Sequence, residues 1–148
     1  MSPEIFEITD LGQLTQWVQA HLEVFSKGHL ILLQGPMGAG KTTLVGEVIK
    51  ALGGSEGQVS SPTFALHHLY PVAGFQVDHM DLYRLSSEED LASSGFFEVV
   101  EDQEHLSFIE WAERIDEEFF KGLQRARVFK ITLSLDTASR RFLQCARL

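Results

Sequence analysis

The sequence contains no asparagine, only four prolines and a single cysteine in 148 residues. Cys145 has no partner within the chain, so an internal disulfide is excluded and a reducing compartment is the natural setting. No apolar run approaches the roughly 18 residues that span a bilayer, which argues against a membrane protein. The segment Met1–Glu4 lacks the basic and apolar regions of a signal peptide. We therefore expect a cytoplasmic protein without membrane association.

Positively charged residues are also scarce over most of the chain. Residues 1–120 carry 5 Lys and Arg against 20 Asp and Glu, whereas residues 121–148 carry 7 against 1. The net charge of −9 disfavours independent binding to a nucleic-acid backbone. The basic C-terminal end has two interpretations, contact with RNA or an acidic partner, and neutralisation of the protein's own acidic body, of which the second is favoured.

Length and hydrophobic patterning predict one domain over residues 1–148 with an α/β fold. The predicted order of elements, β-α-β-α-β-β-α-β-α-β-β, indicates a P-loop NTPase-like, mostly parallel sheet with helices on both faces and antiparallel additions. The predicted strands are Glu4–Ile8, His29–Gln34, Thr63–Tyr70, Phe75–Leu82, Leu106–Trp111, Arg127–Leu135 and Arg141–Ala146. The predicted helices run from an Asp10 cap to about Phe25, over Lys41–Leu52, from a Ser86–Glu89 capping box through Leu91 towards Gly95, and over about Ala112–Leu123.

The most specific motif is GPMGAGKT at Gly35–Thr42, which matches the P-loop pattern G-x-x-x-x-G-K-[ST]. Its glycines let the chain curl so that backbone N–H groups form an anion-binding nest at the start of a helix. The lysine of this motif reaches the β- and γ-phosphates, and the following hydroxyl coordinates Mg²⁺. The predicted nucleotide-binding residues are Gly35, Gly38, Ala39, Gly40, Lys41, Thr42 and, beside the α-phosphate, Thr43.

The absence of asparagine bears on which nucleotide is bound. Guanine-specific P-loop proteins usually read the base with an Asn-Lys-x-Asp motif, which this chain cannot contain. ATP with Mg²⁺ is therefore the expected ligand.

Two acidic residues stand where predicted strands end. The carboxyl ends of strands border the ligand crevice of an α/β sheet, so Asp81 is a candidate metal ligand. Glu110 is a candidate for supporting the metal or orienting the attacking water. The structural alternatives are a turn-capping aspartate and a plain surface glutamate, and both stay open from the residues alone. The predicted metal-binding residues are Thr42, Asp81 and Glu110.

Five further residues carry weaker signals. Thr63 follows Ser61-Pro62 in a loop and is a candidate γ-phosphate sensor, although this tripeptide alone is only a turn signal. Trp111, beside Glu110, is expected either to stack on the base or to pack in the core. His67 and His68 face opposite sides of their predicted strand, so we favour ordinary packing over a zinc site formed with His79.

Several segments resemble the TsaE family, small P-loop ATPases of bacterial tRNA threonylcarbamoyladenosine biosynthesis, in the same order. These segments are LLQGPMGAGKTTL at Leu32–Leu44, SSPTF at Ser60–Phe64, HMDLYRL at His79–Leu85 and FIEW at Phe108–Trp111. The P-loop is shared by many proteins, so the specificity of the resemblance lies in the other three segments and their spacing. It covers about residues 8–115.

The resemblance implies a role for each matching residue. Lys41 and Thr42 would bind phosphate and Mg²⁺, Thr63 would be the switch-like element, and Asp81 and Glu110 would be the metal-supporting and catalytic carboxylates. Trp111 would lie near the nucleotide. The family acts with the partner proteins TsaD and TsaB, which attach the threonylcarbamoyl group to adenosine 37 of tRNA. The resemblance therefore implies an ATPase subunit that meets tRNA only through that complex.

Two departures from the family keep alternatives open. The family usually has an acidic residue and leucine after the first P-loop glycine, where this chain has Pro36 and Met37, and proline after Glu-Trp, where it has Ala112. The first departure leaves open a nucleotide-binding module that does not hydrolyse ATP. A small-molecule kinase is a further alternative, although lid arginines are hard to place. Arg84 and Arg114 are candidates for an arginine finger in cis.

Overall fold

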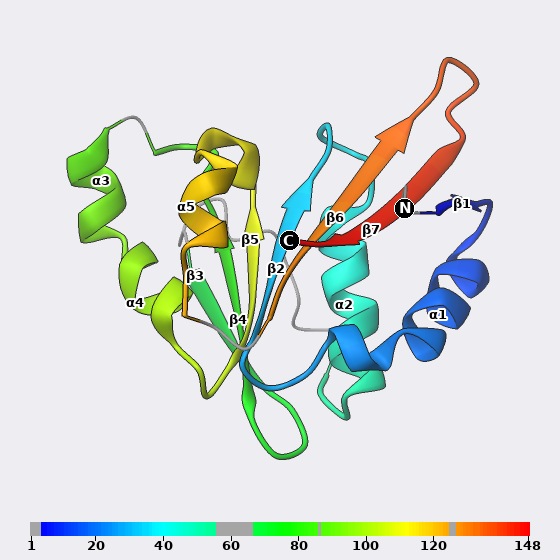
Figure 1. Cartoon of the computed structure of the whole chain (residues 1–148). Helices are drawn as coiled ribbons and strands as arrows, with labels where there is room; N and C mark the ends of the chain where they lie inside the picture. The colour runs from blue at the N-terminus through cyan, green and yellow to red at the C-terminus, as the bar shows by residue number, and fades with distance from the viewer. Residues whose placement is uncertain (1–3, 56–66, 86, 125–126) are drawn as a thin grey trace.

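The computed structural model describes residues 4–55, 67–85, 87–124 and 127–148, which form one mixed sheet between two layers of helices (Figure 1). The strand order is β1-β7-β6-β2-β5-β4-β3. The strands are β1 (Ile5–Ile8), β2 (His29–Gln34), β3 (His67–Pro71), β4 (Gln76–Asp81), β5 (Leu106–Glu110), β6 (Arg127–Leu135) and β7 (Arg141–Arg147). The helices are α1 (Leu11–Ala20), α2 (Lys41–Ala51), α3 (Glu88–Ser93), α4 (Phe96–Glu101) and α5 (Glu117–Lys121), with 3₁₀ turns η1 (Leu22–Val24) and η3 (Ala112–Arg114).

The centre of the sheet is parallel and its edges are antiparallel. Strands β4, β5, β2 and β6 run in the same direction, while β3 at one edge and β7 with β1 at the other run against their neighbours. The predicted α/β class with antiparallel additions is therefore confirmed. Because the four parallel strands share a direction, their carboxyl ends meet at one edge of the sheet, which lies at the top in Figure 1.

Strand β2 shows why the sequence forms this arrangement. Its apolar residues are buried on both faces, as expected for a central parallel strand. Ile31 and Leu33 pack into the core on the α1 and α2 side, and Leu30 and Leu32 pack into the core that includes α4 and α5. Each fully buried side chain of this size contributes about 1.5–3 kcal/mol to folding. The strand thus fixes both helical layers to the sheet and delivers Gly35 to the carboxyl edge.

Two predicted helices are interrupted in the structure. The first, predicted from its Asp10 cap to Phe25, has the predicted cap, with Asp10 Oδ1 accepting from Gln13 N at 2.9 Å, but α1 ends at Ala20. His21 Nδ1 donates to Trp17 O at 2.7 Å and its backbone leaves the helical region, so η1 follows as a separate turn. The last predicted helix likewise divides into η3 and α5, because Asp116 caps a new start.

The region after β4 differs from the prediction in its helix cap. Ser87, rather than Ser86, caps α3, with Ser87 Oγ accepting from Asp90 N at 3.1 Å. Ser86 lies outside the described residues. A second helix, α4, follows Gly95 and was not predicted as a separate element. Its residues Phe96 and Val100 are fully buried.

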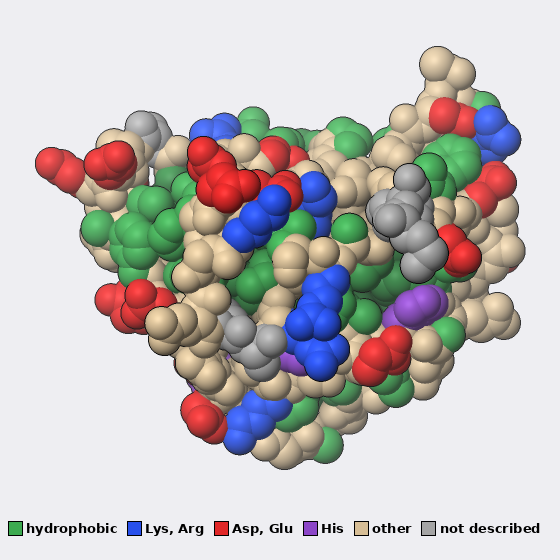
Figure 2. All heavy atoms as spheres, viewed as in Figure 1, with side chains coloured by type: hydrophobic (Ala, Val, Ile, Leu, Met, Phe, Trp, Pro, Cys, Tyr) green, Lys and Arg blue, Asp and Glu red, His purple; other side chains and the backbone are tan. Residues whose placement is uncertain are grey.

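Part of the C-terminal basic charge pairs with acidic residues nearby. Lys130 Nζ lies 3.0 Å from Glu117 Oε2, and Lys121 Nζ lies 3.6 Å from Glu117 Oε1. Blue and red side chains accordingly lie next to one another in the middle of the face in Figure 2. These contacts favour the interpretation in which the basic segment neutralises the protein's own acidic body. Among the described residues, no helix is long and apolar enough to span a bilayer.

Candidate functional site

The P-loop joins the end of β2 to the start of α2, as its sequence predicts. Gly35 has a φ of +145°, and a Cβ placed on it would lie 2.3 Å from the carbonyl oxygen of Leu133 in β6. No side chain fits that space, because the clash is with backbone. Gly40, in the left-handed region with a φ of +106°, precedes α2, and no side chain caps this helix. The first N–H groups of α2 therefore have no side-chain acceptor within the described chain and suit an anion.

Lys41 is buried at the start of α2, with 6% of its surface exposed. Its ammonium donates to Gly35 O at 2.7 Å and lies 3.8 Å from the ring centroid of Trp111. An ammonium can donate three hydrogen bonds, and only this one is made within the described residues. A buried cation with unused donors, above a nest of N–H groups, fits a ligand with several phosphate oxygens.

Asp81 and Glu110 lie side by side at the carboxyl ends of β4 and β5, where they are directly paired in register. Each is 3% exposed. Thr42 Oγ1 donates to Glu110 Oε2 at 3.4 Å, so the helix that follows the P-loop reaches the same carboxylate. Two carboxylates and a hydroxyl are oxygen ligands of the kind that Mg²⁺ prefers. The three residues predicted to bind a metal are therefore brought together.

The partners of Asp81 explain its protonation behaviour. Burial raises the pKa of the Asp81 carboxyl, the Tyr83 N–H that it accepts at 2.7 Å opposes this rise, and the negative charge of Glu110 adds to it. The hydrogen bond from Tyr83 N shows that Asp81 also stabilises a turn, as the structural alternative proposed. This bond is made to Oδ1 of the carboxylate.

Glu110 has a second partner that the sequence did not indicate. His79, in β4, is wholly buried, and its Nε2 donates to Glu110 Oε2. Its Nδ1 has no hydrogen-bond partner among the described residues. His79 thus holds one oxygen of Glu110 from within the core. Its position on the strand two residues before Asp81 was the only sequence signal, since alternate residues of a strand share a face.

Trp111 adopts a left-handed backbone conformation with a φ of 60°, which is rare for a bulky residue. Its ring packs against Tyr83 at a centroid separation of 4.9 Å and against the Lys41 ammonium. It therefore lies beside the P-loop lysine. Strained residues of this kind gather at functional sites.

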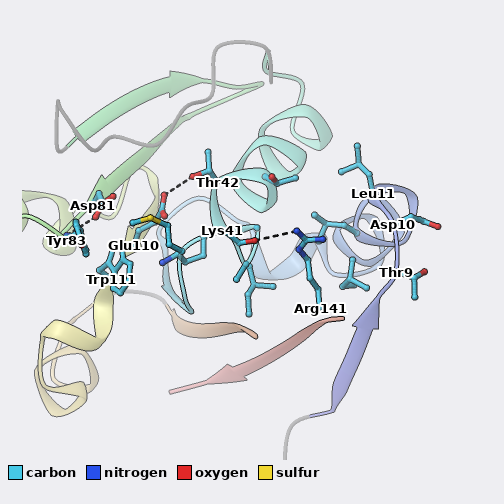
Figure 3. A pocket seen from close by; sticks show the side chains of 18 of the residues that line it. Thr9, Asp10, Leu11, Lys41, Thr42, Asp81, Tyr83, Glu110, Trp111 and Arg141 are labelled. Carbon is cyan, nitrogen blue, oxygen red and sulfur yellow. Dashed lines mark hydrogen bonds between the residues drawn. The ribbon is translucent and has the colours of Figure 1, made fainter. Parts of the chain in front are cut away.

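A cavity of about 630 Å³ connects these groups, within the range of small-molecule sites. Figure 3 shows Asp81, Glu110 and Trp111 on one side of Lys41 and Thr42. On the other side lie Thr9, Asp10, Leu11 and Arg141, which sequence analysis did not assign to a site. Arg141 Nη2 lies 3.5 Å from Gly38 O. Neither β1 nor β7 carries a motif, so only the pairing of these two strands brings their residues here.

Some of the remaining predicted residues line the cavity, and others lie outside it. Thr63 and the rest of Ser60–Phe64 lie outside the described residues. Arg84 lines the cavity, whereas Arg114 Nη1 donates to Leu85 O at 3.3 Å. His68 and His79 are paired in register between β3 and β4, whereas His67 lies on the opposite face and contacts Asp78. The predicted loop residues Gly38–Thr43 all line the cavity.

A buried parallel strand, a glycine loop and a helix, with carboxylates at the ends of neighbouring strands, define a P-loop NTPase-like α/β domain. The profile of the family described as "Threonylcarbamoyl adenosine biosynthesis protein TsaE" matches residues 8–142. The chain belongs to the TsaE family.

Individual relatives agree with this assignment. The Haemophilus influenzae protein named tRNA threonylcarbamoyladenosine biosynthesis protein TsaE is 38% identical over 112 residues, covering 76% of this chain and 69% of that protein. The protein of the same name from Rickettsia felis is 42% identical over 86 residues, covering 58% of this chain and 49% of that protein. The chain thus matches about half the length of the Rickettsia relative. The crystal structure of YdiB from Bacillus subtilis superposes with a TM-score of 0.65 at 21% identity, covering 99% of this chain and 87% of that one, and shows the fold.

Proposed function

We propose that this chain binds ATP with Mg²⁺ and hydrolyses it slowly, as a switch subunit required for threonylcarbamoylation of tRNA adenosine 37. The observation that carries the proposal is the convergence of Lys41, Thr42, Asp81 and Glu110 in one cavity next to the P-loop. These residues come from α2, β4 and β5, and only the fold places them together.

The phosphates would lie on the N–H groups of the P-loop and on Lys41. In this structure the ammonium is turned towards Gly35 O and the Trp111 ring, which keeps it inside the loop. A cation held in a buried site interacts more strongly with phosphate than a solvated one, because the local dielectric is lower. Lys41 is therefore assigned the β- and γ-phosphate contacts.

Thr42, Asp81 and Glu110 would hold Mg²⁺, which neutralises charge that develops on the phosphates during hydrolysis. Glu110 is also assigned the orientation of the attacking water. In hydrolysis, the water oxygen bonds to the γ-phosphorus, the bond to the bridging oxygen breaks, and the water proton passes to an acceptor such as this carboxylate. His79 fixes the carboxylate for that task, because it occupies one of the two oxygens from the core side.

The adenosine end would lie in the half of the cavity formed by the N-terminal segment. Ile8, Leu11 and Leu14 provide apolar surface there, and Arg141 provides a positive charge. Leu11 is 55% exposed and Met37 is 71% exposed, so apolar surface is open to a ligand at this end. Apolar walls with a few polar groups are typical of sites that bind a nucleobase.

The pathway assignment rests on family membership and on the names of the relatives. Proteins with TsaD and TsaB character are the proposed partners, tRNA is met only through that complex, and the cytoplasm is the proposed location. The slow basal rate follows if the charge-stabilising arginine comes from a partner, since an arginine finger increases the rate by about 10³–10⁵. Of the two arginines considered from the sequence for a role in cis, Arg84 lines the cavity and Arg114 does not.

The test is ATP hydrolysis by the purified protein, alone and with TsaB and TsaD, for the wild type, Asp81→Ala and Glu110→Ala. We expect slow turnover that changes with the partners, and carboxylate variants whose turnover falls more than their ATP binding. Normal turnover in both variants would remove the metal and water roles. ATP binding without any turnover would favour the non-hydrolysing module, and phosphate transfer to a small molecule would favour the kinase.

A further inference from the structure

A second group of titratable side chains lies at the opposite end of the parallel strands from the P-loop. Asp78 is the third residue of β4, His105 directly precedes β5, and Asp102 follows α4. All three are brought together where β4 and β5 begin, at the lower end of these strands in Figure 1. None of them belongs to the cavity described above.

The ligand atoms of these residues converge on a small volume. His105 Nδ1 lies 2.7 Å from Asp78 Oδ2 and 3.2 Å from Asp102 Oδ2. The three potential ligand atoms all lie within 4.8 Å of one another. Ligands about 2.0–2.1 Å from a tetrahedral Zn²⁺ are separated by roughly 3.3 Å. The two separations measured from His105 Nδ1 are close to this value.

The single hydrogen on His105 Nδ1 does not satisfy both of the carboxylates that approach it. The Nδ1 of an imidazole carries a single hydrogen, yet two carboxylate oxygens approach the same nitrogen. The Ser107 hydroxyl donates to Asp78 Oδ2 only at 3.4 Å. The ion-pair partners of Asp78 among the described residues are His67 and His105, with no lysine or arginine. A divalent cation between the nitrogen and the two oxygens would balance both negative charges.

Each carboxylate is already oriented by its other oxygen. Asp102 Oδ1 accepts from Glu104 N at 2.6 Å and from His105 N at 3.2 Å, which turns Oδ2 towards the imidazole. Asp78 Oδ1 accepts from His67 Nε2 at 2.5 Å, which leaves Oδ2 for the same centre. Hydrogen bonds of this kind, made to the ligand and not to the metal, are typical of protein metal sites.

The cluster is also accessible from one side. The side chain of Asp78 is 4% exposed, whereas those of His105 and Asp102 are 27% and 28% exposed. A cation can therefore enter from solvent and retain a water molecule in its fourth position. An imidazole with two carboxylates is a ligand set for zinc and related divalent transition metals, whereas Mg²⁺ and Ca²⁺ prefer oxygen alone.

The geometry points to a Zn²⁺-binding site formed by Asp78 Oδ2, Asp102 Oδ2 and His105 Nδ1, with His67 positioning Asp78 from its other oxygen. The site links β4, β5 and the end of α4. It is independent of the proposed ATP site, and either can fail without the other.

The test is titration of the metal-free chain with Zn²⁺ in competition with a chromophoric chelator at neutral pH. We expect one Zn²⁺ per chain in the wild type and binding at least about 100-fold weaker in His105→Gln and Asp78→Asn. His67→Gln should weaken binding by about 10–100-fold, as loss of a positioning partner does. Saturating Zn²⁺ should raise the melting temperature of the wild type but not that of His105→Gln.

Two controls separate this site from other causes of binding. Asp81→Asn removes a carboxylate from the same strand at the P-loop end, and it should bind Zn²⁺ as the wild type does. His68→Gln removes a histidine adjacent to His67 that contacts Tyr70, and it should also bind normally. Unchanged binding in His105→Gln, or loss of binding in Asp81→Asn instead, overturns the proposal. If Asp78→Asn does not fold, His67→Gln and His105→Gln decide the question.

Discussion

Asp78 and Asp81 occupy the same strand and are equally buried, each with 3% of its surface exposed, yet their surroundings are opposite. Asp78 lies near the start of β4 between two imidazoles. Asp81 ends the same strand beside another carboxylate, Glu110. The two side chains project from opposite faces of the sheet, because they are separated by an odd number of positions.

The pKa values of the two carboxyls move in opposite directions for this reason. Burial alone would raise the pKa of Asp78, but hydrogen bonds from His67 and His105 outweigh it and lower that pKa. Burial raises the pKa of Asp81, and Glu110 adds to the rise. Imidazole partners thus stabilise the ionised form of Asp78 even before a metal binds, whereas burial and the charge of Glu110 oppose the ionised form of Asp81.

The largest expected effect is a loss of ATP affinity at the P-loop end of the sheet without any change in Zn²⁺ binding at the other end. Lys41→Ala removes the only buried ammonium of the P-loop cavity, so ATP affinity should fall by at least about 100-fold in an equilibrium binding assay. Zn²⁺ binding at Asp78 should be unchanged. Lys50→Ala, at the exposed end of the same helix, is the matched control and should bind ATP normally. Equal losses of ATP affinity in both lysine variants would show that the loss comes from a disturbed helix and not from the missing Lys41 ammonium.

The next effect concerns the histidine between the two aspartates. His79→Gln should lower ATP turnover by about tenfold or more, because Glu110 loses the partner that orients it. The KM for ATP should change little, since the hydrogen bond of His79 goes to Glu110 and not to the P-loop. His68→Gln serves as the control on the same face of the sheet. Unaltered kcat in His79→Gln, with the fold intact, would contradict the positioning role.

A smaller difference is expected between the melting temperatures of Asp78 and Asp81 variants at neutral pH. The lowered pKa of Asp78 contributes stability above its unfolded-state pKa, and this is lost as pH falls through the folded value. The raised pKa of Asp81 costs stability as pH rises through its folded value. Asp78→Asn should therefore lower the melting temperature, and Asp81→Asn should raise it, each by a few degrees for an effect on the order of 1 kcal/mol. Melting temperatures that shift in the same direction in both variants would contradict the opposite pKa changes of the two carboxyls.

The smallest effect concerns Cys145, on β7. Burial, with a contribution from Glu23, raises the pKa of its thiol to about 11. The thiolate is the reactive form, so a thiol reagent should modify the native protein far more slowly than the unfolded chain at pH 8. The rate should rise only as pH approaches 11. Rapid labelling of native protein at neutral pH would show that the folded chain does not protect this half-buried thiol.

The sequence predicted the parts of the site that local rules determine. Residues from Gly35 to Thr43 form a contiguous motif, and Asp81 and Glu110 end apolar strands, so their convergence followed from the parallel sheet. Arg141 and Leu11 lie far apart in the chain, and no local pattern anticipates the pairing of β1 with β7 that places both in the cavity. The Asp78 cluster was missed for the same reason, since Asp102 and His105 stand in a loop.

The helix boundaries show a different limit. Periodicity indicated continuous helices where His21 and Asp116 interrupt them, because a side chain that bonds to the backbone competes with helix continuation. Propensity and apolar spacing do not register such bonds. Helix α4 was not predicted for another reason, because its six residues are too few to show a helical period.

We propose that Asp81, at the carboxyl end of β4, supports the cation that accompanies ATP, whereas Asp78, near the other end, does not. The most direct test measures ATP affinity with and without Mg²⁺ for the wild type, Asp81→Asn and Asp78→Asn. We expect the Mg²⁺-dependent gain in ATP affinity to be lost in Asp81→Asn and retained in Asp78→Asn. A full Mg²⁺-dependent gain in Asp81→Asn would contradict it.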